Sequence, residues 1–208
     1  MTNHAHALPP HPAPWAEIVP GMGPVIVADL LTIPDDGYIY EVVEGVLVRM
    51  AGSGRRATTI ASIINSALFT FVFPRRLGIV TGAGGVYTFP GAETGLIPDA
   101  GFYLAERDAT IPDSGKDKPI PFAPDLAVEV ASPSQDADEM ATKARLYLRG
   151  GTRLVWVVWP SSGHIDVWRP ERTDGLVTTL NITETLEGAD VLPGFTYPVV
   201  SVFADPLA

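Results

Sequence analysis

The clearest alternation of apolar and polar positions lies at residues 125–131, which read DLAVEVA. Successive side chains of a strand point to opposite faces, so Leu126, Val128 and Val130 share one face of the predicted strand. Glu129 lies on the other face, between two alanines. An ionised carboxylate in a buried strand is costly unless it is paired, protonated or bound to a cation. The pattern therefore predicts a core strand that also carries a chemical site.

The pattern before this strand predicts a hairpin, one long helix and several short strands. Residues 25–31 are typical of a short helix or an edge segment, and residues 38–50 of a β-hairpin with a glycine in its turn. Residues 55–73 carry apolar side chains at helical spacing and predict the main helix, which we expect to end before Pro74. The glycine-interrupted residues 78–90 predict two short strands.

The second half of the chain predicts a parallel crossover. Residues 97–104 predict an apolar strand that contains Asp99, and residues 106–122 predict a polar loop with prolines. After the strand at 125–131, an aspartate cap with a glutamate three residues later begins a helix over about 136–149, and two glycines end it. The apolar residues 153–160 then predict a strand, so strand, helix and strand form a parallel unit. With further strands near the C-terminus, the order indicates an α+β or mixed α/β fold.

Composition indicates one folded domain over residues 25–208, because 208 residues with 46% hydrophobic content can bury a sizeable core. Residues 1–24 are rich in Pro, Ala and His, lack the features of a secretory peptide, and are predicted to be a mobile tail. No apolar run approaches the ~20 residues that span a bilayer, so we expect a cytoplasmic protein without a membrane partner.

The charge and the missing cysteines exclude several kinds of chemistry. Zero cysteines exclude disulfides, thiolate catalysis and Cys-based zinc or iron–sulfur sites. The net charge of −10 argues against non-specific coating of nucleic acid, although bound divalent cations would offset part of it. The arginine pairs that flank the main helix either contact a phosphate backbone or are solvated helix ends.

Asp99 and Glu129 are the first candidates for chemistry. Mg²⁺ and Mn²⁺ prefer oxygen ligands and usually take one or two protein carboxylates. The alternative for Asp99 is an ordinary polar residue after a proline at the start of a strand. Lys143, on the helix that follows Glu129, could stabilise charge on a phosphoryl group or be an exposed lysine. Glu41, inside the first hairpin strand, is either a third acid near the metal or a solvent-facing residue.

Several blocks of the chain resemble, in order, the Uma-type family of proposed restriction endonucleases, which belongs to the PD-(D/E)XK nuclease superfamily. The resemblance runs from about residue 25 to 205 and rests on the blocks YEVVEGVLVRM, PDAGFYL, APDLAVEVASPS, GGTRLVWVVWP and EGADVLPGF. It implies a restriction-endonuclease-like core, a mixed sheet with flanking helices and extra hairpins.

The resemblance also implies roles for particular residues. The Pro-Asp motif of the superfamily falls with its acid at Asp99, and the acid of its second motif falls on Glu129. The lysine two positions later in that motif would be Ala131 here, and Lys143 stands where the family's lysine does. The family glutamate of the first strand matches Glu41.

Our first hypothesis is a metal-dependent endonuclease that hydrolyses phosphodiester bonds of nucleic acid, with DNA as the expected substrate and a homodimer as the expected assembly. Asp99 and Glu129 would hold Mg²⁺ or Mn²⁺ with the Val130 carbonyl, Lys143 would position water, and Glu41 would act from the metal's outer shell.

The alternatives are catalytically inactive proteins. One is the same scaffold used as a DNA-binding or protein-interaction module, which is favoured by the acidic charge and by Arg55-Arg56 where many relatives carry a histidine. The other is a structural subunit that dimerises through its strand edges.

Overall fold

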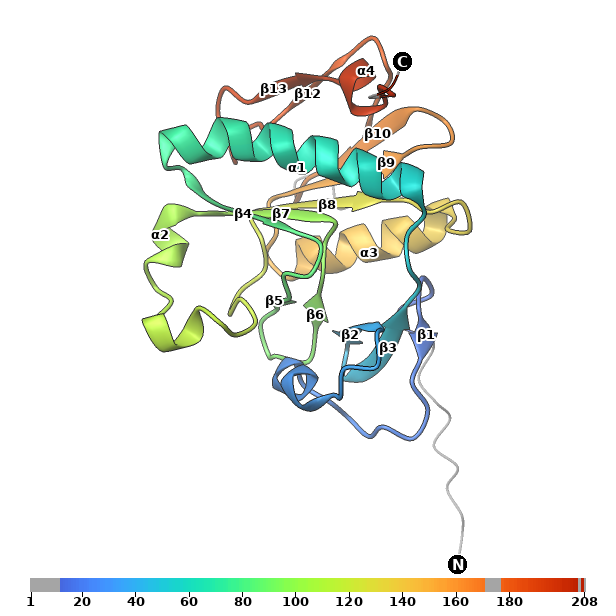
Figure 1. Ribbon diagram of the computed structural model, residues 1–208, viewed down its shortest axis with the longest axis vertical. Helices are drawn as coiled ribbons and strands as arrows, with labels where there is room; N and C mark the ends of the chain where they lie inside the picture. The colour runs from blue at the N-terminus through green and yellow to red at the C-terminus, as the bar shows by residue number, and fades with distance from the viewer. Residues whose placement is uncertain (1–11, 171–176, 206, 208) are drawn as a thin grey trace, which may run out of the picture.

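The structure is a computed structural model that describes residues 12–170, 177–205 and 207. It contains a six-stranded sheet, a five-stranded sheet and a two-stranded sheet. In Figure 1, α1 lies above the six-stranded sheet and α3 below it, with the hairpin β2–β3 beyond α3. The elements with their bounds are β1 Glu17–Ile18, η1 Val27–Thr32, β2 Ile39–Val43, β3 Val46–Met50, α1 Arg55–Arg75, β4 Gly78–Gly82, β5 Tyr87–Thr88, β6 Gly95–Leu96, β7 Ala100–Leu104, α2 Ala105–Asp108, η2 Asp113–Gly115, β8 Leu126–Val130, α3 Ala137–Arg149, β9 Leu154–Trp159, β10 His164–Trp168, β11 Thr178–Leu180, β12 Thr185–Glu187, β13 Thr196–Pro198 and α4 Val199–Val202.

The six-stranded sheet has the order β11-β10-β9-β8-β7-β4. Strands β8 and β9 are parallel and are joined through α3, while the other neighbouring pairs in this sheet are antiparallel. The predicted parallel crossover is therefore confirmed. Helix α3 begins as predicted, because the Asp136 carboxylate accepts the Glu139 N–H at 2.9 Å and the Glu139 side chain accepts the Asp136 N–H.

The two faces of β8 belong to two separate hydrophobic cores, as the period of two predicts. Leu126, Val128 and Val130 pack into the core that contains the buried face of α1. Ala127 and Ala131 pack into the core that contains the buried side of α3. Glu129 therefore enters the interior on the α3 side of the sheet.

The main helix is longer than predicted. It ends at Arg75 and includes Pro74 in its last turn, so the predicted end before Pro74 is wrong. A proline in the last turn removes one backbone donor, and Arg76 closes the helix in the left-handed conformation (φ 53°) with its N–H bonded to carbonyls of that turn. The Arg75 guanidinium donates to the Phe71 carbonyl at 2.9 Å.

Among the described residues, α1 is the one helix whose length and composition would let it cross a bilayer. This is weak support for a membrane segment, because core helices of soluble proteins meet the same criteria. Ile60, Ile64 and Leu68 are buried in the core between α1 and the six-stranded sheet. The predicted absence of a membrane partner stays a prediction.

The N-terminal segment differs from its prediction. Residues 13–19 are attached to the folded body, within the segment 1–24 that was predicted to be a mobile tail; residues 1–11 lie outside the described residues. Ala13 and Trp15 are buried, and β1 pairs antiparallel with β3. Burial of these apolar side chains and pairing with a free strand edge stabilise a segment whose composition resembles a linker.

The region around Asp99 and the loop after it also have different boundaries from those predicted. The strand predicted over 97–104 starts at Ala100, and β6 ends at Leu96. Pro98 lies between them and has no backbone N–H for a strand ladder. The segment 106–122, predicted as a loop, overlaps α2 and contains η2.

Candidate active site

Asp99 and Glu129 lie opposite each other on neighbouring segments of the sheet. Strands β7 and β8 pair with Ala100 opposite Val128, and extending this register by one residue places Asp99 opposite Glu129. Glu129 points to the α3 side of the sheet, whereas Asp99 precedes β7 and directs its carboxylate at the Val130 N–H beside it. Asp99 also contributes to the raised pKa of Glu129, as a nearby like charge does.

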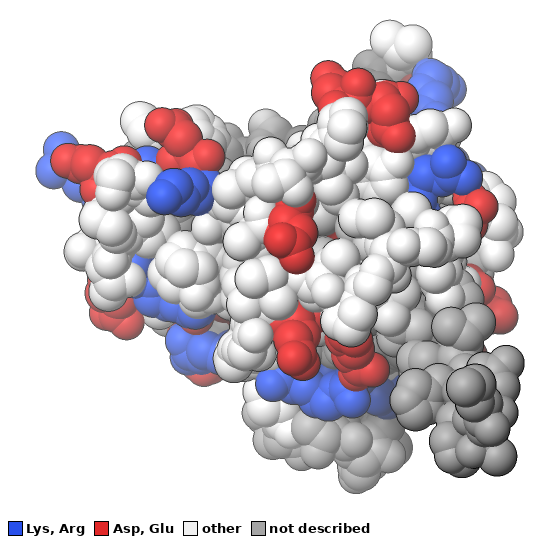
Figure 2. All heavy atoms as spheres, turned by 90° about the horizontal axis from the view of Figure 1, so that it is seen from below, with Lys and Arg blue, Asp and Glu red and all other residues white. Residues whose placement is uncertain are grey.

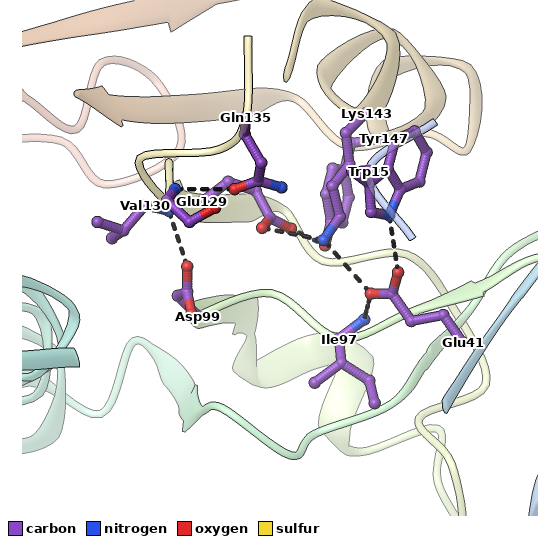
Figure 3. Close-up of polar contacts among 10 residues, drawn as sticks. Trp15, Glu41, Ile97, Asp99, Glu129, Val130, Gln135, Lys143 and Tyr147 are labelled. Carbon is purple, nitrogen blue, oxygen red and sulfur yellow. Dashed lines mark hydrogen bonds and ion pairs between the residues drawn. The ribbon is translucent and has the colours of Figure 1, made fainter. Parts of the chain in front are cut away.

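Asp99 is held against the end of β8. Its Oδ2 accepts the backbone N–H of Val130 at 2.7 Å, a contact drawn in Figure 3. Burial raises the pKa of the Asp99 carboxyl, while the Val130 N–H and the charge of Lys143 act in the opposite direction. The role predicted for the Val130 carbonyl as a metal ligand stays a prediction.

Two side chains of α3 bind the Glu129 carboxylate. Lys143 Nζ lies 3.0 Å from Oε2, and the Tyr147 hydroxyl donates to Oε1 at 2.7 Å. Lys143 and Tyr147 are four residues apart, so one face of the helix presents both. Burial raises the pKa of Glu129 to about 8, with Lys143 opposing this shift.

Lys143 connects Glu129 to Glu41. Its Nζ lies 3.4 Å from Glu41 Oε1 as well as next to Glu129, and its side chain is only 3% exposed. Burial acts to lower the pKa of Lys143, but the charges of Glu129 and Glu41 raise it overall. The lysine is therefore a buried ammonium between two acids, which excludes the alternative of an exposed helix lysine.

Glu41 is completely buried, so the alternative of a solvent-facing edge residue is wrong. Its Oε1 accepts the Ile97 backbone N–H at 2.8 Å, and its Oε2 accepts the Trp15 indole N–H at 3.2 Å. Figure 3 shows Glu41 reaching Lys143 from the side opposite Glu129. Glu41 thus lies beside the lysine of the cluster, as a partner of that lysine.

Asp99 links this buried cluster to the surface. Its side chain is partly exposed and borders a hollow of about 490 Å³ between α1 and the end of β4. The other residues that line this hollow are mostly small or neutral polar: Thr58, Ala61, Ser62, Asn65, Ser66, Phe69, Gly82 and Ala83. A substrate that enters here meets Asp99 before the buried residues.

The charges of the cluster fit a divalent cation. Three carboxylates, from Glu41, Asp99 and Glu129, face one ammonium, which leaves two negative charges uncompensated when all four groups are ionised. Uncompensated charge in the interior is costly, and a divalent cation would neutralise it. Within the described residues no three His, Cys, Asp or Glu side chains form a ready ligand set. Mg²⁺ usually takes only one or two protein carboxylates, and Asp99 and Glu129 are the two that would supply them, with Lys143 and Tyr147 bound to the Glu129 oxygens when no metal is present.

Sequence reasoning missed two donors to Glu41, the Trp15 indole and the Ile97 backbone. The one available signal for Trp15 was a single tryptophan within a proline-rich stretch, and nothing local to it indicated a partner. Two of the arginines that accompany α3 have structural partners: Arg149 pairs with Glu44 and Arg153 with Asp190.

A mixed sheet between two helices, with an acidic pair at the β7–β8 edge and a lysine from the next helix, defines a restriction-endonuclease-like α+β protein. The chain matches the Uma2 family, described as "Putative restriction endonuclease", over residues 27–201, and it belongs to this family.

A solved structure supports the fold. The chain resembles a crystal structure described as a "putative nuclease belonging to DUF820 from Anabaena variabilis ATCC 29413", with a TM-score of 0.74 and 19% identity. The match covers 86% of this chain and 98% of that one. At this identity the likeness shows a shared fold. No curated protein matches the chain.

Proposed function

We propose that this protein is a metal-dependent endonuclease that hydrolyses phosphodiester bonds of DNA. The observation that carries the proposal is the placement of Asp99 and Glu129 opposite each other across β7 and β8, with Lys143 3.0 Å from Glu129. Membership of a family of proposed restriction endonucleases supports the same class of reaction.

Asp99 and Glu129 would hold Mg²⁺ or Mn²⁺, with the Val130 carbonyl as a further ligand. When bound, the ion supplies Lewis-acid stabilisation and lowers the pKa of water. The protein contributes the Glu129 carboxylate from β8 and the Asp99 carboxylate from the residue before β7, which the Val130 N–H holds in place.

Lys143 acts as a fixed cation near the scissile phosphate. Its raised pKa keeps it protonated, so it donates hydrogen bonds and stabilises negative charge, and it is not a general base. Glu41 and Glu129 hold the ammonium in place from two sides. Tyr147 donates to Glu129 and keeps that carboxylate directed at the lysine.

Substrate approaches through the hollow beside α1. The Ser66 hydroxyl can bind phosphate or sugar oxygens there, while Thr58, Ser62 and Asn65 already donate hydrogen bonds to backbone carbonyls. Figure 2 shows another face of the molecule, on which the described acidic and basic side chains are interspersed and form no broad basic surface.

The test is cleavage of plasmid DNA by the purified protein with Mg²⁺, with Mn²⁺ and with a chelator. We expect cleavage only with metal, and a loss of about a hundred-fold or more in Asp99→Asn and in Glu129→Gln, because each removes a preorganised charge at the reacting centre. Asp113→Asn is the matched control, since Asp113 is an exposed acid paired with Lys116. It should retain full activity.

Calorimetric titration with Mg²⁺ separates the alternatives. Binding that disappears in Asp99→Asn supports the nuclease. Cleavage that survives both Asp99→Asn and Glu129→Gln would remove these residues from the mechanism. No cleavage together with no metal binding would instead support an inactive scaffold that binds DNA or another protein. The predicted homodimer and the cytoplasmic location stay predictions.

A further inference from the structure

Trp15 is built into the candidate site although it lies outside residues 27–201, the part of the chain that matches the family. It is 7% exposed. Its indole N–H donates to Glu41 Oε2 at 3.2 Å, and Lys143 Nζ lies 5.7 Å from the centre of its ring. One side chain therefore contacts both members of the Glu41–Lys143 pair, as Figure 3 shows.

The backbone around Trp15 is attached to the strand pair that carries Glu41. Strand β1 pairs with β3, with Ile18 opposite Val48. Val48 is also opposite Glu41 in the β2–β3 hairpin. The N-terminal segment, residues 13–18, is thus held in register with the same hairpin that positions the glutamate.

The contacts of Trp15 differ from those of a tryptophan that only fills a core. The buried indole nitrogens of Trp156 and Trp168 have no hydrogen-bond partner in the described structure, so this fold accommodates buried indoles whose N–H groups are unpaired. Trp15 instead directs its N–H at a carboxylate and its ring at an ammonium, which combines a charge-assisted hydrogen bond with a cation–π contact.

We propose that Trp15 is a positioning residue of the site: its N–H holds Glu41 and its ring covers Lys143, so that the lysine is directed at Glu129. The expected effect of replacing Trp15 on DNA cleavage rests on the proposed function. Its expected effect on the position and protection of Lys143 does not. Residues 13–18 are accordingly needed for the site, in addition to residues 27–201, which match the family.

Chemical modification of lysine tests the contact without reference to activity. The chain has three lysines, and Lys116 and Lys118 are exposed while Lys143 is buried. The full-length protein is treated with an amine-acetylating reagent, and each site is followed by mass spectrometry. In the wild type we expect Lys143 to react more slowly than the other two. In Trp15→Ala its rate should rise about ten-fold, which is what loss of a hydrogen bond to a charged group allows.

Matched variants keep the result interpretable. Trp15→Phe retains the ring but loses the donor, and should raise the rate for Lys143 less than Trp15→Ala does. Trp159→Phe is the control, because the Trp159 indole also donates to a carboxylate, that of Asp166 at 2.8 Å, on a different part of the sheet. It should leave Lys143 protected. Far-UV circular dichroism identifies any variant that fails to fold. If Trp15→Ala does not fold, the modification rate of Lys143 in Trp15→Phe tests the proposal.

Cleavage kinetics give the second readout. Trp15→Phe should lower kcat by about ten-fold with little change in KM, as changes to residues that orient a metal site typically do, and Trp159→Phe should change neither. The inference is wrong if folded Trp15→Phe and Trp15→Ala both keep wild-type kcat and wild-type protection of Lys143. If the wild type cuts no DNA, the proposed function fails, and the Lys143 modification rates alone decide the inference.

Discussion

Replacing Lys143 with methionine removes the one cation of the buried cluster while keeping most of the side-chain volume. The substitution leaves Glu129 and Glu41 without their shared partner at 3.0 and 3.4 Å. Removing one partner of a buried ion pair costs about 3–5 kcal/mol, because the remaining charge is left uncompensated. For a chain of this size, about 2–4 °C of melting temperature is lost per kcal/mol, so we expect a decrease of about 6–20 °C.

The measurement is thermal unfolding followed by circular dichroism in metal-free buffer at several pH values. Without Lys143 the pKa of Glu129 rises further above its unfolded value. A group with a raised folded-state pKa contributes stability that is present below the unfolded pKa and is lost as pH rises through the folded pKa. Burial already raises the pKa of Glu129 to about 8, so wild type and Lys143→Met lose this contribution in parallel below pH 8, and the deficit of Lys143→Met should grow only above pH 8.

Two further variants test whether the loss comes from the buried ion pair. Lys116→Met removes an exposed lysine that pairs with Asp113 at 2.8 Å, and it should leave the melting temperature unchanged. Adding Glu129→Gln to Lys143→Met should recover part of the loss, since the uncompensated anion is then gone. A Lys143→Met protein with the same melting temperature as the wild type at pH 9, or with a deficit no larger at pH 9 than at pH 7, would show that the ion pair is absent.

Three other expectations follow from the site and the fold. Saturating Mg²⁺ should raise the free energy of unfolding of the wild type by about 2.7 kcal/mol at a hundred times Kd, seen as a higher melting temperature, and should not do so in Asp99→Asn. Asp136→Ala should cost about 1 kcal/mol in urea unfolding, because it removes the side-chain cap of α3. Gly101→Ala should cost about 1–3 kcal/mol in the same assay, since its new Cβ would lie 2.5 Å from the Tyr87 hydroxyl. Gly52→Ala, with no atom within 4 Å of its Cβ, is the control, and equal stability of the two variants would contradict the packing argument.

The elements that were predicted correctly are those whose signals come from residues close together along the chain. The two faces of β8, the start of α3 at Asp136 and the β2–β3 hairpin follow from alternation, capping and turn residues. Each signal involves residues within a few positions of one another, so the pattern is visible without knowing the fold. The end of α1 was misjudged because a proline usually stops a helix, whereas α1 continues for one residue past Pro74 before Arg76 closes it.

The candidate residues could be named from the sequence, but their relations could not. Asp99, Glu129 and Lys143 stand out as charges in or next to apolar elements. Whether Lys143 is exposed or buried, and whether Glu41 faces solvent or the interior, depends on which elements pack together. The structure buries both and joins them through a contact between β2 and α3, two elements far apart along the chain.

By itself, the sequence determined the family, through blocks that resemble those of the family in the same order. It also determined the kind of elements and the acids that are candidates for chemistry, because these depend on local periodicity and on residue type. Only the tertiary structure placed Asp99 opposite Glu129, put Lys143 between two carboxylates and brought Trp15 from a linker-like segment against Glu41. The physical reason is that the energy of a buried charge depends on what surrounds it in space, and those surroundings come from segments that no local pattern relates.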